Sequence, residues 1–154
     1  MACRTAAWPA ADLAQPGWTV MRGQAVWTAR RGAPEIAGEL LWARRADGEL
    51  FLEFQKTPFP LVTARWRPEA WQVEFVPQRR TLRGRGGPSA RLGWLHLARA
   101  LGDAPPDHAW HWQRPEGGHW RLENPHTGEV IEGFVEHFEG GDQPFVSFGP
   151  AQRP

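Results

Sequence analysis

Histidines are the residues of this chain that first suggest chemistry, because five of the six lie between His108 and His137. In the segment HAWH, His108 and His111 are three residues apart, a spacing that metal sites also use. On a hairpin in which Arg114 pairs with His119, however, His111 and His119 fall on opposite faces and do not converge. We therefore expect surface histidines on a tryptophan-rich hairpin, and we predict no metal site and no cofactor.

Four arginines and a glycine-rich turn precede a predicted helix in the segment RRTLRGRGGPS (Arg79–Ser89). A turn of this kind at a helix N-terminus resembles an anion cradle. The segment lacks the Lys-Ser/Thr pair of a phosphate-binding P-loop. The net charge of +1 also gives no field that would attract a nucleic acid. A strand-to-helix connection with solvated arginines explains the segment, and an anion-binding enzyme is a minor alternative.

Nucleophilic groups are few and lack the partners that catalysis needs. Cys3 is the single cysteine, which excludes an internal disulfide and a cysteine-based metal site. Ser89 and Ser147 lie in no nucleophile elbow or triad context. Glu49 and Glu53 alternate on a predicted strand, where solvated carboxylates are common. We therefore expect that the protein is not an enzyme.

Alternation of apolar and polar residues with a period of two predicts that most of the chain forms antiparallel strands. Trp18–Arg30 and Glu35–Arg45 form a long predicted hairpin, and the Asp-Gly pair at 47–48 predicts the next turn. One helix is predicted in PSARLGWLHLARALGD, with Ser89 as its N-cap and Gly102 at its C-terminal end. The remaining strands are predicted in LFLEF, LVTARW, WQVEFV, the Arg-rich segment, the hairpin HAWHWQR/HWRLEN and the closing strand GEVIEGFVEHFE, which makes eight or nine strands in all.

Many strands and one helix favour a mainly β fold, in which a single curved antiparallel sheet forms an unclosed β-barrel with a helical lid. We divide the chain into a flexible leader or tether at 1–17, the half-barrel domain at 18–139 and a Gly/Pro-rich tail at 140–154. No apolar run approaches the roughly 20 residues that span a bilayer, and no full signal peptide is present. As written, the sequence predicts a soluble chain.

The large apolar residues have more apolar surface than one short helix can cover, since the chain has ten Trp and eight Phe. The alternation places one set of them on the inner face of the sheet, with two leucines of the helix above it. Plain core packing explains such a set, and so does an apolar cavity that holds a ligand. The residues predicted to line it are Leu40, Trp42, Leu50, Leu52, Phe54, Trp71, Val73 and Phe75 from the sheet, with Leu92 and Leu95 from the helix.

The order of these segments resembles the LolB family, the outer-membrane receptor for lipoproteins. The resemblance rests on Arg22-Gly23, Leu41-Trp42, the strand LFLEF and Pro58-Phe59, and it extends over 18–123. It implies that the apolar cavity accepts the acyl chains of lipoproteins and that the protein inserts them into the outer membrane, without a nucleotide or a covalent step. It also implies the periplasmic carrier LolA as the donor and the inner leaflet of the outer membrane as the acceptor.

The same resemblance gives Cys3 and the segment KTPFPLV a role. Family members carry lipid on the first residue of the mature chain, and Ala2-Cys3 matches the end of a lipobox, so we expect lipidation at Cys3. The expected location is the cell outer membrane, facing the periplasm. Pro58 and Pro60 cannot donate ladder hydrogen bonds, so the segment is predicted to leave the sheet as a loop. Phe59 then either folds back against the barrel rim or projects outward as a membrane-insertion residue, as the resemblance implies.

Two other functions fit the same residues. A lipocalin-like binder of a small apolar molecule would use the same inner face. A structural envelope lipoprotein without transfer activity would fill that face with core side chains. What lies between the helix and the sheet is therefore the observation that separates these functions.

Overall fold

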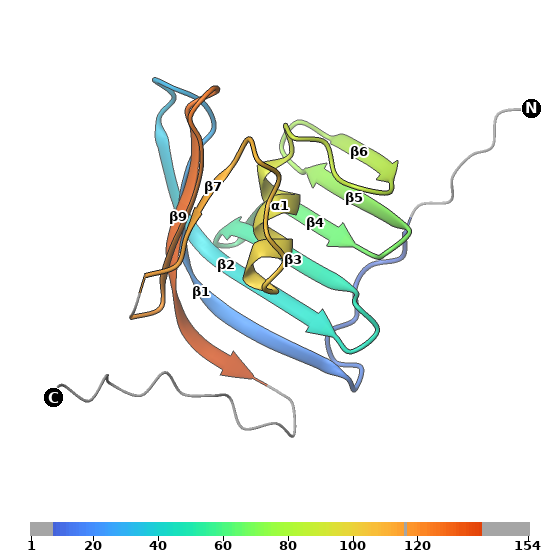
Figure 1. Ribbon diagram of the computed structural model, residues 1–154. Coiled ribbons are helices and arrows are strands. Elements are labelled where there is room, and N and C mark those ends of the chain that lie inside the picture. The colour runs from blue at the N-terminus through green and yellow to red at the C-terminus, as the bar shows by residue number, and fades with distance from the viewer. Residues whose placement is uncertain (1–7, 116, 140–154) are drawn as a thin grey trace, which may run out of the picture.

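Nine strands make up most of the described part of the computed structural model, residues 8–115 and 117–139. They form one antiparallel sheet in the order β6-β5-β4-β3-β2-β1-β9-β8-β7, and Figure 1 shows that the sheet curves around α1. Because β6 and β7 are its two edges, the sheet is not closed, which confirms the predicted fold class. The elements are β1 Trp18–Thr28, β2 Glu35–Arg45, β3 Leu50–Lys56, β4 Phe59–Trp66, β5 Ala70–Phe75, β6 Arg80–Arg85, α1 Gly93–Leu101, β7 His111–Gln113, β8 His119–Asn124 and β9 Glu129–Glu139.

Short turns fix the register of the first strands. The Asp47-Gly48 pair forms the predicted turn between β2 and β3, and the Asp47 carboxylate accepts a hydrogen bond from the Glu49 backbone N–H at 3.0 Å. Gly48 has a φ of +91°, which L side chains rarely adopt. The turn therefore aligns β2 and β3, with Trp42 opposite Leu52 and Leu40 opposite Phe54.

β9 lies between β1 and the C-terminal hairpin, two strands from the β7 edge of the sheet. It pairs with β1 on one side and with β8 on the other, so the C-terminal hairpin continues the sheet beyond the N-terminal strand. Figure 1 shows β9, β1 and β2 as long curved neighbours that form one wall beside α1. This long-range pairing makes the nine strands one continuous sheet.

The helix begins later than the sequence predicts. α1 spans Gly93–Leu101 with Leu92 at the N-cap position, and no side chain caps it. The Ser89 hydroxyl oxygen instead accepts a hydrogen bond from the Arg91 backbone N–H at 3.3 Å, in a turn that precedes the helix. The prediction of Ser89 as the N-cap was wrong because this turn and the non-helical backbone of Leu92 separate it from the helix. Gly102 does end the helix as predicted.

The segment with Pro58, Phe59 and Pro60 differs from the predicted loop. Only Thr57 and Pro58 lie outside the strands, and Phe59 begins β4 opposite Lys56. A register shift between Phe54 and Gln55 accommodates the prolines within the ladder. The prediction of a loop was wrong because Pro58 lies in a two-residue turn outside the ladder and Pro60 lies at the register irregularity, where a strand tolerates a residue without an N–H.

The hairpin between β7 and β8 has a register one residue away from the predicted one. Gln113 pairs with Arg121 and His111 pairs with Glu123. Because side chains alternate along a strand, this shift puts His111 and His119 on the same face, where the sequence analysis placed them on opposite faces. Among the described residues, no group of three or more His, Cys, Asp or Glu side chains could hold a metal ion.

The N-terminal segment from residue 8 onward packs on the convex face of the sheet. Ala11 and Leu13 lie against a second buried cluster formed by Trp18, Val20, Ala43 and Phe51. The predicted flexible leader at 1–17 therefore includes a stretch that covers apolar side chains of the domain. The expected tail at 140–154 and the first seven residues lie outside the described residues.

A buried ion pair also holds this N-terminal segment. Arg65 Nη2 is 2.7 Å from Glu49 Oε1, and the two residues are 8% and 7% exposed. Arg65 also donates to the Pro9 carbonyl oxygen, and its guanidinium carbon lies 5.3 Å from the ring centroid of Trp8. Glu49 is thus not the solvated carboxylate that the alternation pattern suggested, because its strand end is covered.

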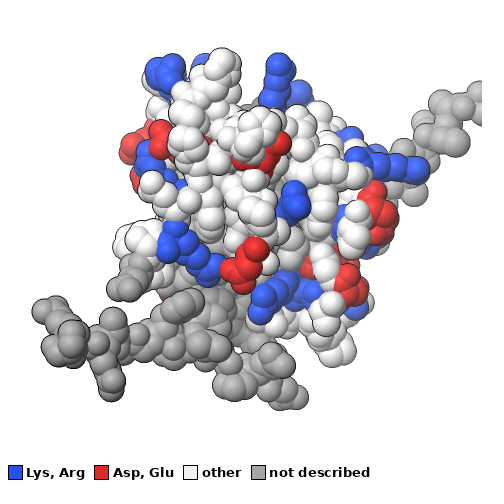
Figure 2. Space-filling model, in the orientation of Figure 1, with Lys and Arg blue, Asp and Glu red and all other residues white. Residues whose placement is uncertain are grey.

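Charged side chains are mixed in sign over the surface. Figure 2 shows Lys and Arg interspersed with Asp and Glu around the face that carries α1, and neither sign dominates that view. The arrangement agrees with the net charge of +1. Within the described residues, no helix has both the length and the apolar character needed to cross a membrane.

Candidate functional site

The eight sheet residues predicted to line an apolar cavity share the concave face, and Leu92 and Leu95 lie above it, at and in α1. All ten belong to or pack against one cluster beneath α1. Leu50 and Phe75 are partly buried, and the other eight are buried, namely Leu40, Trp42, Leu52, Phe54, Trp71, Val73, Leu92 and Leu95. The alternation thus identified the correct face, while α1 occupies the space above it.

Aromatic contacts fasten α1 to the sheet. Trp94 of the helix stacks on Phe54 with ring centroids 4.9 Å apart, and Trp27 meets Trp94 edge-on at 5.4 Å. The Trp42 indole N–H donates to the Ala98 carbonyl oxygen at 2.8 Å. The helix is therefore held mainly by apolar burial, with one buried hydrogen bond to its backbone from Trp42.

Several buried polar atoms near α1 have no hydrogen-bond partner. They are Nε1 of Trp71, Trp94 and Trp120 and Nδ1 of His96. The other ring nitrogen of His96 is 3.0 Å from the Ser89 carbonyl oxygen, and burial lowers the pKa of His96. An unpartnered buried donor costs about 1–3 kcal/mol, so these groups carry an energetic cost that a purely aliphatic core would avoid.

Glu129 lies at the N-terminal end of α1, where β9 begins. Its Oε1 accepts a hydrogen bond from the Trp27 indole N–H at 3.0 Å. The same oxygen is 3.2 Å from the point that a Cβ on Gly93 would occupy, so the carboxyl borders the first residue of the helix. Burial raises the pKa of Glu129 to about 7, against the opposing effect of the Trp27 hydrogen bond. No sequence motif marked this acid, because its burial depends on contacts between distant strands.

Phe59 is the one large hydrophobic side chain that is exposed among the described residues, at 69%. It stands at the turn between β3 and β4, opposite Lys56 in the ladder. Of the two predicted orientations, the side chain has the outward one. Its neighbours Pro58 and Pro60 flank it in the turn and in β4, as the sequence order requires.

The other predicted chemical groups do not converge. Arg80, Arg83 and Arg85 lie along the edge strand β6, which pairs with β5 as an ordinary ladder. Cys3 and Ser147 lie outside the described residues. A pocket lies on the convex face, across the strands from β2 to β7, and it is lined by none of the predicted cavity residues.

Comparison with known proteins gives one partial similarity. No family model matches the chain. The chain is 30% identical over 105 residues to an argininosuccinate lyase of Streptomyces coelicolor, a match that covers 64% of this chain and 22% of that enzyme. The chain thus spans about a fifth of the length of this relative. A match of this extent does not carry the activity of the whole enzyme over to this chain, and the resemblance to the LolB family stays a prediction.

Proposed function

We propose that this chain is a lipid-anchored, LolB-like protein that accepts the acyl chains of lipoproteins under α1 and inserts them into the outer membrane. The proposal rests on Phe59, an exposed aromatic residue opposite Lys56 at the turn between β3 and β4. The concave face of the same sheet is apolar. Two features support it together: an apolar face covered by one short helix, and an aromatic tip that can enter a bilayer interface.

Acyl chains would replace α1 on the concave face. Burying one methylene contributes about 0.8 kcal/mol, so an acyl chain of about 15 methylenes gains on the order of 12 kcal/mol. Trp94, Leu97 and Leu101 lose burial when the helix leaves, at about 1.5–3 kcal/mol for each side chain. The three losses sum to roughly 4.5–9 kcal/mol and offset a large part of this gain, so binding and release respond to changes in the surroundings, such as contact with a membrane. A helix of nine residues is marginal in water by itself, which suits a removable lid.

The anchor and the partners follow from the same proposal. Lipid on Cys3 would hold the domain at the inner leaflet of the outer membrane, and LolA would deliver the cargo. Mass spectrometry of the membrane fraction tests the anchor, because the N-terminal peptide should carry a diacylglyceryl group. An unmodified thiol in the native host would remove lipidation from the proposal.

Liposome binding of the unlipidated chain tests the role of Phe59. Phe59→Glu should abolish association with anionic liposomes and change the free energy of unfolding by less than about 0.5 kcal/mol, as for other exposed sites. The matched control is His108→Glu, which makes the same charge change at a side chain that is 97% exposed. If both variants bind liposomes like the parent chain, Phe59 has no membrane role.

Acyl binding tests the lid. Trp42→Phe removes the hydrogen bond to Ala98, which is worth about 1 kcal/mol. Because the bond exists only with α1 in place, its loss should tighten binding of a fluorescent fatty acid by up to about fivefold. Trp18→Phe makes the same chemical change in the cluster on the convex face and should leave that affinity unchanged.

Binding of fatty acid and acylated lipopeptide by the parent chain also separates the alternative functions. Saturable binding of free fatty acid without uptake of an acylated lipopeptide favours the lipocalin-like binder. No saturable binding by a folded chain favours the structural envelope lipoprotein, since α1 then serves as a permanent part of the core.

A further inference from the structure

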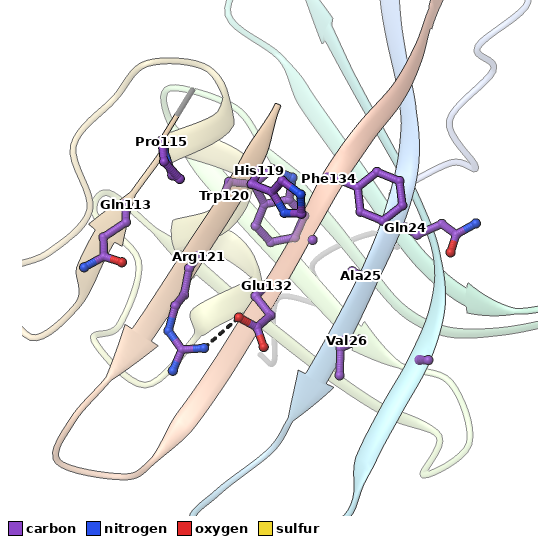
Figure 3. Close-up of a pocket in the computed structure, with 12 residues that line it drawn as sticks. Gln24, Ala25, Val26, Gln113, Pro115, His119, Trp120, Arg121, Glu132 and Phe134 are labelled. Carbon is purple, nitrogen blue, oxygen red and sulfur yellow. Dashed lines mark hydrogen bonds and ion pairs between the residues drawn. The ribbon is translucent and has the colours of Figure 1, made fainter. Parts of the chain in front are cut away.

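The convex face carries a trough between two rows of side chains that run across the strands. Gln24, Phe134 and His119 are aligned by direct pairing of β1, β9 and β8 and form one wall. Val26, Glu132 and Arg121 are aligned two residues further along the same strands and form the other wall. Figure 3 shows these two rows with the Arg121–Glu132 ion pair on one side and the Phe134 and His119 rings on the other.

The floor of the trough is backbone. Ala25 and Gly133 lie between the two rows, and their strand positions face the core. A Cβ on Gly133 would overlap the Gln24 carbonyl oxygen, so glycine is needed for the close approach of β9 to β1. Two residues along a strand span about 6.6 Å. The two walls are therefore far enough apart for one flat ring in van der Waals contact with both. The pocket encloses about 530 Å³, within the range of small-molecule sites.

One guanidinium and one carboxylate line the trough, and two further carboxylates lie beside it. Arg121 contacts Glu132 at 2.7 Å and Glu123 at 3.2 Å, so two carboxylates share one guanidinium. A third carboxylate, Glu136, accepts a hydrogen bond from the Gln24 amide at 3.0 Å. The three carboxylates and one guanidinium named here sum to −2. The hydrogen bond from Arg121 occupies Oε2 of Glu132, and no described residue is hydrogen bonded to Oε1.

We propose that this trough binds a small flat organic cation, of the amidinium or guanidinium class, with an apolar body. Its planar cationic group donates to Glu132 Oε1, and its π-face lies against the Phe134 and His119 rings. These rings lie 5.7 Å apart between centroids and form one aromatic wall, which attracts a cation over its face. Val26 and Ala37 extend the apolar part of the site at the other end. The site is separate from the concave face, so it neither requires nor excludes acyl binding.

Binding of benzamidine tests the charge preference, with benzoate and benzamide as an anion and a neutral molecule of the same shape. Backbone amide shifts of Ala25 and Gly133 in two-dimensional NMR report occupancy of the floor. Benzamidine should give saturable shifts at these positions, with an affinity at least tenfold above that of either analogue. Equal binding of benzoate or benzamide, or no saturable shift with benzamidine, would overturn the proposal.

Two variants with opposite expected effects make the test independent of general damage to the fold. Glu132→Gln should weaken benzamidine binding at least tenfold. Arg121→Gln removes the competing guanidinium and should tighten it several-fold, which a merely disrupted site cannot do. Glu74→Gln, the matched control on β5 of the same face, should leave the affinity unchanged. Weakening by both Glu132→Gln and Arg121→Gln, or an equal effect of Glu74→Gln, would contradict cation binding in this trough.

Discussion

Glu129 should make the stability of the fold depend on pH. Its folded-state pKa is about 7 against 4.5 for an exposed glutamate, because burial under the N-terminal end of α1 disfavours the charged form. Between these two values the folded chain retains a proton that the unfolded chain has lost. Stability is therefore fully present below about pH 4.5 and falls as the pH rises to about 7.

The size of the effect follows from the shift. Each pKa unit corresponds to about 1.4 kcal/mol, so the loss reaches about 3 kcal/mol once the pH exceeds 7. Glu129→Gln keeps an oxygen that accepts the Trp27 hydrogen bond and has no charge to bury. At pH 8 the variant should be more stable than the parent chain by up to about 3 kcal/mol, and at pH 4 the two should be nearly equal.

Urea unfolding followed by tryptophan fluorescence at half-unit steps from pH 4 to pH 8 measures the difference. Subtracting the variant from the parent cancels the contribution of His96, whose lowered pKa makes stability fall as the pH drops below about 6.5. Trp27→Phe provides a second check, since loss of the hydrogen bond to the carboxylate should enlarge the pH-dependent loss. A difference that is constant with pH, or a parent chain that is more stable than Glu129→Gln at pH 8, would refute the reasoning.

Three further substitutions test the packing. Arg65→Met leaves Glu49 buried with a weaker partner and should lower the free energy of unfolding by about 3 kcal/mol, measured by urea titration; an effect below 1 kcal/mol would mean that water reaches Glu49. Gly133→Ala should destabilise by at least about 2 kcal/mol because its Cβ overlaps the Gln24 carbonyl oxygen, and an unchanged thermal midpoint would contradict that contact. Phe54→Ala should cost about 3–5 kcal/mol as a fully buried ring beneath α1, and a cost near zero would show that α1 does not pack on it.

Local patterns predicted the strands and the face they bury. The bounds of the strand Glu35–Arg45 were predicted correctly, because the Asp47-Gly48 turn follows it and fixes where the strand ends. The same alternation placed Leu52, Phe54 and Val73 on one face. Such features depend on residues close in sequence, which is why a single chain suffices to infer them.

Predictions from local sequence patterns were wrong where contacts between distant residues determine the structure. α1 begins at Gly93 and not directly after Ser89. Buried contacts with the sheet set the position of the helix, and no capping side chain does so. The β7–β8 hairpin pairs Gln113 with Arg121, one residue away from the register that the turn residues suggested. The candidate trough could not be predicted for the same reason, because its walls come from strands about 100 residues apart.

The antiparallel strands, the single amphipathic helix and the apolar face could all be inferred from the sequence, since each property follows from side chains two to four positions apart. Three features depend on tertiary contacts instead: α1 fills the concave face, Phe59 remains outside, and Glu49 is buried while Glu129 is partly buried. Burial of a charge depends on which strands and segments cover it, and that depends on the pairing of β9 with β1 and on the path of the N-terminal segment.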